Sequence, residues 1–201
     1  MFHLGNSHVE IKKLDTHHIQ RLSNEIPLFA EHKDVLNKID IFFKFQELPM
    51  GTIVQAQYAK LTDIHWLLDG KCQVMKEYPF IVEKANGKTV CHAYNPGTAL
   101  LGSQKLQTIK KTLKIIGPGS FFPNLDKLEL IKKYSYVDHY SNQAQKNPFT
   151  VICKTNCMIA SIPITVFLER CSPAILNAMI HNPSVTDGSD VISIEEMEAH
   201  V

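Results

Sequence analysis

The residues with the clearest chemical signature run from Gly117 to Asn124, in the order Gly-Pro-Gly-Ser-Phe-Phe-Pro-Asn. They follow an apolar run from Leu113 to Ile116. Glycines in such a loop let the backbone approach an anion closely, and a helix that starts after the turn would direct free N–H groups at it. The loop contains no basic residue, and its last two places hold Pro123 and Asn124 rather than an acid. The sequence therefore predicts an anion-binding turn that lacks charged ligands.

Other side chains that could do chemistry are scattered along the chain. The histidines do not have the spacing of a zinc protease or a metal cupin; they include His17, His18, His65, His92 and His139. Cys153 and Cys157 bracket Lys-Thr-Asn, which is typical of a strand turn, so we interpret them as structural thiols rather than metal ligands. Gly102-Ser103-Gln104 lacks the pattern of a nucleophile elbow. The sequence thus predicts neither catalytic residues nor a metal site.

Composition narrows the class of protein. The chain has 201 residues, is 44% hydrophobic and carries a net charge of +1, which suits one domain and argues against general nucleic-acid binding or electrostatic attachment to membranes. Its apolar runs fall short of the roughly 20 residues of a membrane helix, and its start lacks the features of a signal peptide. Five scattered cysteines, an odd number, indicate reduced thiols in a cytosolic-type compartment. We therefore expect a cytoplasmic protein.

The hydrophobic pattern predicts helices, then many short strands, then helices. The helices are expected at residues 8–24, 33–41, 164–170 and 174–180. The strands are expected at 52–54, 63–68, 72–75, 80–82, 89–91, 112–116, 149–153 and 158–162, with a hairpin turn at 85–88 and a looser region at 95–111. Short strands separated by glycine turns favour a mainly β, antiparallel roll with flanking helices (α+β) over a parallel sheet.

Six phrases of the chain follow one another in a characteristic order: Ile26–Phe29, Leu48–Val54, Ile64–Val74, Ile116–Phe122, Phe149–Cys153 and Cys157–Leu168. Together they resemble the cyclic nucleotide-binding domain family, the β-roll module of protein kinase A regulatory subunits, catabolite activators and cyclic-nucleotide-gated channels. The resemblance implies an antiparallel jelly-roll-like β-roll with N-terminal helices and short C-terminal helices. It divides the chain into an N-terminal helical segment at 1–25, a β-roll domain at 26–182 and an acidic tail at 183–201, which we interpret as mobile or partner-bound.

The departures from the family concern its ligands. Where the family has Phe-Gly-Glu, whose acid binds the ribose, this chain has Phe122-Pro123-Asn124. Where the family has an arginine for the cyclic phosphate, this chain has Asn147. An arginine–phosphate fork is a strong contact, and its loss costs about 2–5 kcal/mol. The segments 76–114 and 127–146 are also longer than in the family.

If the pocket is retained, the resemblance implies that nine residues line it: Gly119, Ser120, Phe121, Phe122, Asn124, Lys146, Asn147, Phe149 and Thr150. The simpler interpretation is that the glycines form turns and that the two phenylalanines anchor the core rather than stack on a base. Lys146 or Lys127 could replace the missing arginine, and Asn124 could still bind a ribose hydroxyl.

We therefore expect a non-enzymatic, cyclic nucleotide-binding-like regulatory or structural interaction module with a degenerate pocket and no cofactor. Its partners would be proteins or a larger assembly, and the resemblance suggests a cilium or flagellum as its setting. A lysine cluster at 105–133 is either a solvated face or a surface that docks an acidic partner. The alternatives are a cAMP or cGMP sensor, with weak binding through non-standard phosphate ligands, and a small metal-dependent or hydrolytic enzyme on a related roll. We expect no nucleic-acid binding and no membrane insertion.

Overall fold

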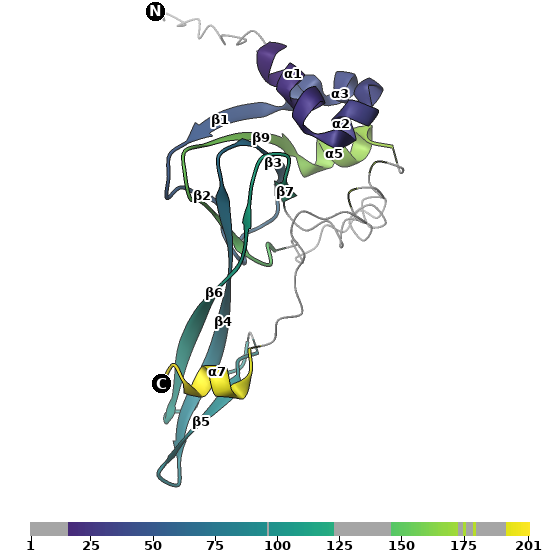
Figure 1. The fold of residues 1–201 in the computed structure, drawn as a ribbon. Helices are drawn as coiled ribbons and strands as arrows, with labels where there is room; N and C mark the ends of the chain where they lie inside the picture. The colour runs from purple at the N-terminus through teal and green to yellow at the C-terminus, as the bar shows by residue number, and fades with distance from the viewer. Residues whose placement is uncertain (1–15, 96, 123–145, 173–174, 176–178, 180–191) are drawn as a thin grey trace, which may run out of the picture.

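Two antiparallel sheets form the centre of the computed structural model, which describes residues 16–95, 97–122, 146–172, 175, 179 and 192–201 (Figure 1). The first sheet has the order β1-β9-β3-β7, and its strands are β1 (Lys44–Leu48), β9 (Cys157–Pro163), β3 (Asp63–Asp69) and β7 (Phe121–Phe122). The second joins β2 (Ile53–Gln55), β8 (Thr150–Cys153), β4 (Cys72–Ala85), β5 (Lys88–Ala93) and β6 (Gln104–Ile116). The predicted fold class, an antiparallel β-roll with flanking helices, is confirmed.

A long arm extends away from the roll (Figure 1). It consists of residues 76–111 and contains most of β4 and β6 and all of β5. Strand β6 pairs with β4 from Cys72 to Glu83, whereas β8 pairs with β4 only from Cys72 to Met75. Beyond Met75 the ladder therefore leaves the roll. The separate strands predicted at 72–75 and 80–82 are one strand, and the second half of the predicted loose region at 95–111 belongs to strand β6, so both predictions were wrong in extent.

Pro79 lies in the middle of β4 without interrupting it. Its carbonyl accepts a hydrogen bond from the Tyr94 N–H at 3.4 Å, which shows that this edge of Pro79 faces β5. The β5 ladder begins only at Phe80, paired with Ala93. Since the N–H and C=O of a strand residue point to the same edge, the missing N–H of Pro79 falls at the end of the β5 ladder rather than within it, where a proline is tolerated. At the tip, Asn86 and Gly87 have φ of 53° and 77°, as a type I′ hairpin requires.

The helices gather on one side of the roll (Figure 1). They are α1 (Thr16–Glu25), α2 (Pro27–Glu31), α3 (Lys33–Ile39), the 3₁₀ turn η1 (Asp40–Phe42) and α5 (Ile164–Arg170), while α7 (Ile194–Glu198) lies on the arm. Ile26 separates α1 from α2, and Pro27 occupies the first turn of α2, where no N–H is needed. In the described part of the chain, no helix is long and apolar enough to cross a membrane.

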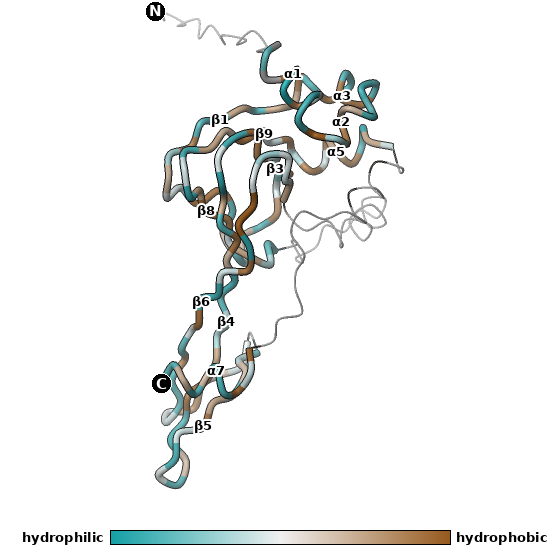
Figure 2. Tube along the Cα trace, viewed as in Figure 1, coloured by the Kyte–Doolittle hydropathy of each residue, from teal (hydrophilic) through white to brown (hydrophobic). Residues whose placement is uncertain are grey.

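Three clusters of buried hydrophobic side chains hold the described elements together. Figure 2 shows apolar stretches in the strands of both the roll and the arm. The helix cluster packs α1, α2, α3 and α5 around Trp66, whose ring lies 5.3 Å from that of Phe29 and 5.6 Å from that of Phe167. The roll cluster fills the space between the sheets around Phe122, Phe149 and neighbouring aliphatic residues. The arm cluster combines arm residues with the C-terminal segment: Phe80, Val82, Cys91, Ile109, Ile192 and Met197.

Residues 192–201, the described end of the segment that we interpreted as a mobile or partner-bound tail, pack on the arm of the same chain. Met197 of α7 is 6% exposed and Ile192 is 7% exposed. Ser193 and Glu196 form a capping box that starts α7, and the Glu196 carboxylate lies 3.4 Å from Lys111 Nζ. The helix predicted at 174–180 and the longer segment at 127–146 both lie largely outside the described residues.

Candidate functional site

The glycine loop is stabilised by hydrogen bonds within the fold. The Gly119 N–H donates to the Leu67 carbonyl at 2.8 Å, and the Ser120 N–H donates to the Gly117 carbonyl at 3.2 Å. Gly119 has φ of +83°, and a Cβ there would lie 3.4 Å from the Glu25 carbonyl of α1. Glycine at this position thus permits a left-handed turn beneath α1. The N–H groups of Gly119 and Ser120 therefore already have partners, and the helix start that we expected after the turn lies outside the described residues.

The two phenylalanines after this loop are buried, as expected for core anchors. Phe121 pairs with Trp66 and Phe122 pairs with His65 across β7 and β3. Phe121 belongs to the helix cluster and Phe122 to the roll cluster. The Phe122 ring also stacks on the His65 imidazole, with centroids 5.2 Å apart and planes at 28°. Asn124, the expected ribose ligand, lies outside the described residues.

The predicted phosphate side of the site lies against residues 55–60, which connect β2 to β3. The Asn147 N–H donates to the Ala59 carbonyl at 2.9 Å, and the Tyr58 N–H donates to the Asn147 carbonyl at 2.8 Å. Lys146 forms an isolated antiparallel bridge with Lys60. The backbone around Asn147 is therefore fixed by main-chain pairing rather than left open to a ligand.

Two further predicted site residues bond to the same segment. The Phe149 carbonyl accepts from Gln55 Nε2 at 3.2 Å, and the Thr150 Oγ1 accepts from the Gln57 N–H at 3.0 Å. Tyr58 has φ of 65°, an uncommon conformation for a non-glycine residue that needs support from its surroundings. Its bond to Asn147 supplies that support. Residues 55–60 thus form hydrogen bonds with residues 146–150, the segment that leads into β8.

A small cavity of about 120 Å³ lies between these segments; it is lined by residues 54–56, 59–63, His65 and Asn147. Three buried polar atoms of its lining residues have no partner among the described residues: Gln55 Oε1, His65 Nδ1 and Asn147 Oδ1. Gln55 and Asn147 are each only 5% exposed. A polar cavity of this size holds ordered water, which would satisfy these atoms.

The electrostatics of the cavity are those of neutral groups. Burial lowers the pKa of His65 to about 4, and the nearby Asp63 carboxylate opposes this only partly. At neutral pH the imidazole is therefore uncharged, like the two amides. Lys60, the cation among the lining residues, is exposed to solvent. The cavity can hydrogen-bond small polar molecules or water, and it provides no buried positive charge for a phosphate.

Gln55 and His65 were not among the predicted pocket residues. Gln55 lies between the strands expected at 52–54 and 63–68, and His65 was weighed only as a metal ligand. The polar residue at the end of β2 and the histidine within an apolar strand were the available signals. Their meeting with Asn147 depends on the pairing of β2 with β8, which a single sequence does not reveal.

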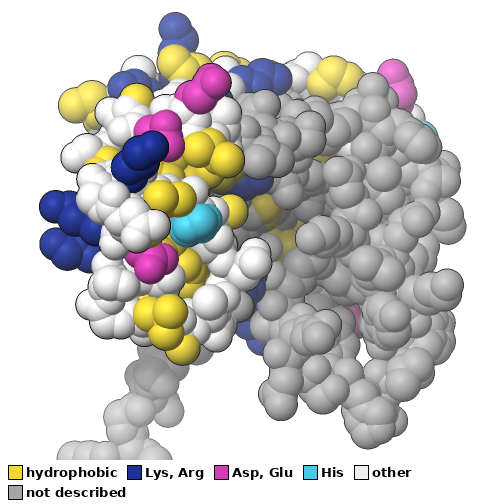
Figure 3. Space-filling view, turned by 90° about the horizontal axis from the view of Figure 1, so that it is seen from below, with side chains coloured by type: hydrophobic (Ala, Val, Ile, Leu, Met, Phe, Trp, Pro, Cys, Tyr) yellow, Lys and Arg dark blue, Asp and Glu magenta, His cyan; other side chains and the backbone are white. Residues whose placement is uncertain are grey.

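The lysine cluster is partly neutralised within the chain. Lys110 Nζ lies 2.9 Å from a Glu77 carboxylate oxygen, and Lys111 pairs with Glu196 of α7. On the described part of the face in Figure 3, basic, acidic and hydrophobic side chains are mixed rather than gathered by kind. The two ion pairs favour a solvated face for Lys110 and Lys111; Lys132 and Lys133 fall outside the described residues.

Comparisons with known proteins bear on the fold. No family model and no curated protein matches the sequence. Solved structures do match. The regulatory subunit of a cAMP-independent protein kinase A from Trypanosoma brucei superposes with a TM-score of 0.51 at 16% identity, over 84% of this chain and 48% of that one. That from Trypanosoma cruzi, bound to guanosine, gives 0.51 at 13% identity, over 84% of this chain and 47% of that one.

The sensor domain of the transcriptional regulator DNR from Pseudomonas aeruginosa gives a TM-score of 0.50 at 12% identity, over 83% of this chain and 85% of that one. The chain spans about half the length of the kinase regulatory subunits it matches. These neighbours are regulatory and sensor proteins. With its two antiparallel sheets, its glycine loop and its N-terminal helices, the chain has a divergent form of the cyclic nucleotide-binding domain fold.

Proposed function

We propose that this chain is a non-enzymatic, cyclic nucleotide-binding-like module whose pocket has degenerated, and that it acts as a regulatory or structural subunit through protein contacts. The observation that carries the proposal is the environment of Asn147. At the position of the family's phosphate-binding arginine, the chain has a neutral amide, 5% exposed, with its backbone tied to Tyr58 and Ala59.

Cavity size and charge support the same conclusion. Ligand pockets usually measure about 300–1,000 Å³, whereas the cavity beside Asn147 measures about 120 Å³. Its buried polar groups are neutral, so a cyclic phosphate that entered would be desolvated without a compensating cation. The N–H groups of Gly119 and Ser120 would have to break existing hydrogen bonds to reach it. Each of these features weakens nucleotide binding.

The structural neighbours are compatible with loss of the ligand. One of them is the regulatory subunit of a cAMP-independent kinase, and another is bound to guanosine. The fold thus does not by itself require cAMP. The arm supplies a surface that the roll does not provide, and its loop exposes Leu100 and Leu101, at 43% and 64%. We propose this arm as the element that contacts protein partners, in a cytoplasmic and, by resemblance, ciliary or flagellar setting.

Isothermal titration of the full chain with cAMP and with cGMP tests the proposal. We expect no saturable heat at micromolar ligand, and the same result for an Asn147→Ala variant, because Asn147 would hold no nucleotide. A submicromolar dissociation constant for either nucleotide would contradict the degenerate pocket.

A functional sensor remains the second candidate, and one observation favours it. Lys60 lines the cavity, and Lys146 forms a backbone β-bridge with Lys60, so both lysines lie beside Asn147. If the titration detects binding, Lys146→Ala and Lys60→Ala decide whether these lysines replace the arginine. A sensor that uses them would lose at least about tenfold in affinity, as expected for a charge-assisted contact of about 1.5–3 kcal/mol.

A further inference from the structure

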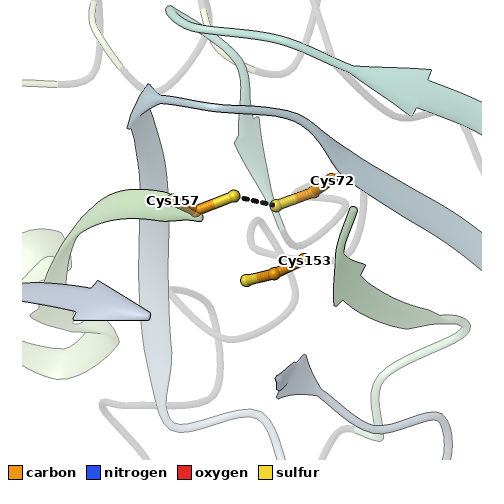
Figure 4. Close-up of side chains that lie close together, drawn as sticks. All are labelled: Cys72, Cys153 and Cys157. Atoms are coloured by element: carbon orange, nitrogen blue, oxygen red, sulfur yellow. Dashed lines mark hydrogen bonds between the residues drawn. The ribbon is translucent and has the colours of Figure 1, made fainter. Parts of the chain in front are cut away.

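Three cysteines from different strands meet at one end of the roll (Figure 4). Cys72 begins β4, Cys153 ends β8 and Cys157 begins β9. Their sulfur atoms all lie within 4.8 Å of one another, and the Sγ atoms of Cys72 and Cys157 are 3.7 Å apart. This cluster, which we name the cysteine trio, is separate from the cavity beside Asn147, since none of its members lines that cavity.

The backbone holds the cysteine trio in place from both sheets. Cys72 and Cys153 are register partners in the second sheet, while Cys157 belongs to the first. The turns that connect these strands are interlocked: the Lys154 N–H donates to the Lys71 carbonyl at 2.8 Å, and the Lys71 N–H donates to Thr155 Oγ1 at 2.9 Å. The convergence of the sulfurs therefore follows from strand pairing.

The surroundings of the cysteine trio are apolar. Cys72, Cys153 and Cys157 are 0%, 1% and 4% exposed and belong to the roll cluster. Binding of a metal would convert the coordinating thiols to thiolates, and the charge of the cation would balance theirs in these apolar surroundings.

We propose that Cys72, Cys153 and Cys157 together bind one soft d¹⁰ metal cation through their sulfurs. Thiolates select Cu(I) and Zn(II) among biological metals. Two sulfurs about 2.3 Å from a common ion lie about 3.8 Å apart at a tetrahedral angle and about 4.0 Å apart at a trigonal one, and both separations are close to the 3.7 Å between Cys72 and Cys157. On binding, each coordinating thiol releases its proton to solvent and the metal keeps its oxidation state.

The number of donors favours Cu(I). Among the described residues, no histidine, carboxylate or further cysteine joins the group of three. Structural zinc sites are almost always four-coordinate, whereas Cu(I) is satisfied by three sulfur ligands. Because the ligands come from both sheets, the bound ion would cross-link the two sheets at this end of the roll.

The test is anaerobic titration of the full chain, reduced and metal-free, with Cu(I) alone and with Zn(II) alone, each in competition with a chelator. We expect one Cu(I) per chain, weaker binding of Zn(II) and a higher Tm with Cu(I). Cys157→Ser is the informative variant, because its hydroxyl can replace the thiol that donates to the Lys71 and Thr155 carbonyls at 3.4 Å. It should weaken Cu(I) binding by more than about 100-fold. This loss is larger than the one expected when the mutated residue only hydrogen-bonds to a metal ligand.

Cys91→Ser is the matched control, since Cys91 is also buried but lies in the arm cluster. It should bind Cu(I) like the wild type. Cys72→Ala provides a second loss of ligand in case Cys157→Ser does not fold. Failure of the wild type to bind either metal stoichiometrically would overturn the proposal, as would equal affinities of the wild type and a folded variant of the cysteine trio. Stoichiometric Zn(II) binding without Cu(I) binding would overturn the assignment to copper.

Discussion

His65 is the residue whose burial has the clearest consequence for the response of this protein to pH. Its folded pKa of about 4 lies below the ordinary value of about 6.5. Between these values the native state binds fewer protons than the unfolded state. The stability that His65 contributes is therefore complete above about pH 6.5 and is lost as the pH falls towards 4, by an amount of order 3 kcal/mol.

We predict that His65→Phe flattens this dependence. Phenylalanine keeps a ring stacked on Phe122 and removes the buried Nδ1 that has no partner. Urea midpoints measured from pH 4 to pH 7 should vary less for this variant than for the wild type. His92→Gln, at an exposed position on β5, is the control and should keep the wild-type slope. If His65→Phe and His92→Gln gave the same slope, the buried imidazole would not be the source.

Gly70 lies in the turn between β3 and β4. Its replacement by alanine should lower the free energy of unfolding more than the same change at other turn glycines. Its φ is +88°, and a Cβ there would lie 2.8 Å from Cys157 Sγ and 2.9 Å from Thr155 Oγ1, in addition to a clash with the Asn156 carbonyl. Gly70→Ala should lower the free energy of unfolding by about 3 kcal/mol, because steric overlap adds to the left-handed conformation.

Gly87 provides the comparison for that prediction. Its φ is +77°, but a Cβ there would meet nothing within 4 Å. Gly87→Ala should lower the free energy of unfolding by only about 1 kcal/mol, because only the left-handed backbone conformation disfavours alanine there. Urea unfolding of both variants gives the two values, and equal costs would mean that the close approach at Gly70 does not contribute.

At the scale of elements, we expect α7 and the arm to stabilise each other through the arm cluster. Met197→Ala should remove the buried apolar side chain of α7 from the arm cluster, at a local cost of about 2–3 kcal/mol. Hydrogen exchange should then accelerate in β5 and the outer part of β6, with β9 unchanged. Met50→Ala, at a residue 70% exposed, should leave all strands unchanged. Unaltered exchange in β5 after Met197→Ala would show that α7 does not stabilise the arm.

The elements that the sequence predicted well are those whose own pattern carries the signal. Strand β3 alternates and then becomes apolar, and β9 ends in buried residues, so both were placed correctly. Strand β1 was missed because none of its residues is buried. Strand β6 was underestimated because its outer half is mostly exposed and is held by pairing with β4, which is a non-local interaction.

The candidate site was less predictable for the same reason. Asn147 and the glycine loop were identified from the order of the phrases; Asn147 lines the cavity, whereas no described residue of the loop does. The covering of 146–150 by residues 55–60 depends on hydrogen bonds between segments about ninety residues apart. The cysteine trio is a similar case: the spacing of Cys153 and Cys157 was visible, but Cys72 joins them only through strand register.

At the scale of the whole molecule, the described residues form two separately cored units, the roll with its helices and the arm with α7. The arm cluster shares no residue with the other two clusters. Strands β4 and β6 are the continuous connection between them, and Gln57 fixes the point where β4 leaves the roll. Its side chain accepts from the Glu77 N–H at 2.6 Å and donates to the Glu77 carbonyl at 3.0 Å. Because a unit with its own core can fold by itself, the roll should not require the arm.

Excision of the arm tests this independence. Removing 78–109 and 192–201 keeps Glu77 and its register partner Lys110, which an Asn-Gly type I′ turn can join. Trp66 is the single tryptophan and lies in the helix cluster, so its fluorescence reports on the roll alone. We expect a cooperative urea transition with a midpoint close to that of the full chain and a smaller m-value, since less surface is exposed on unfolding. If Trp66 were exposed to solvent in the shortened chain and unfolding were not cooperative, the roll would need the arm in order to fold. The arm would then not be a separate folding unit that contacts protein partners.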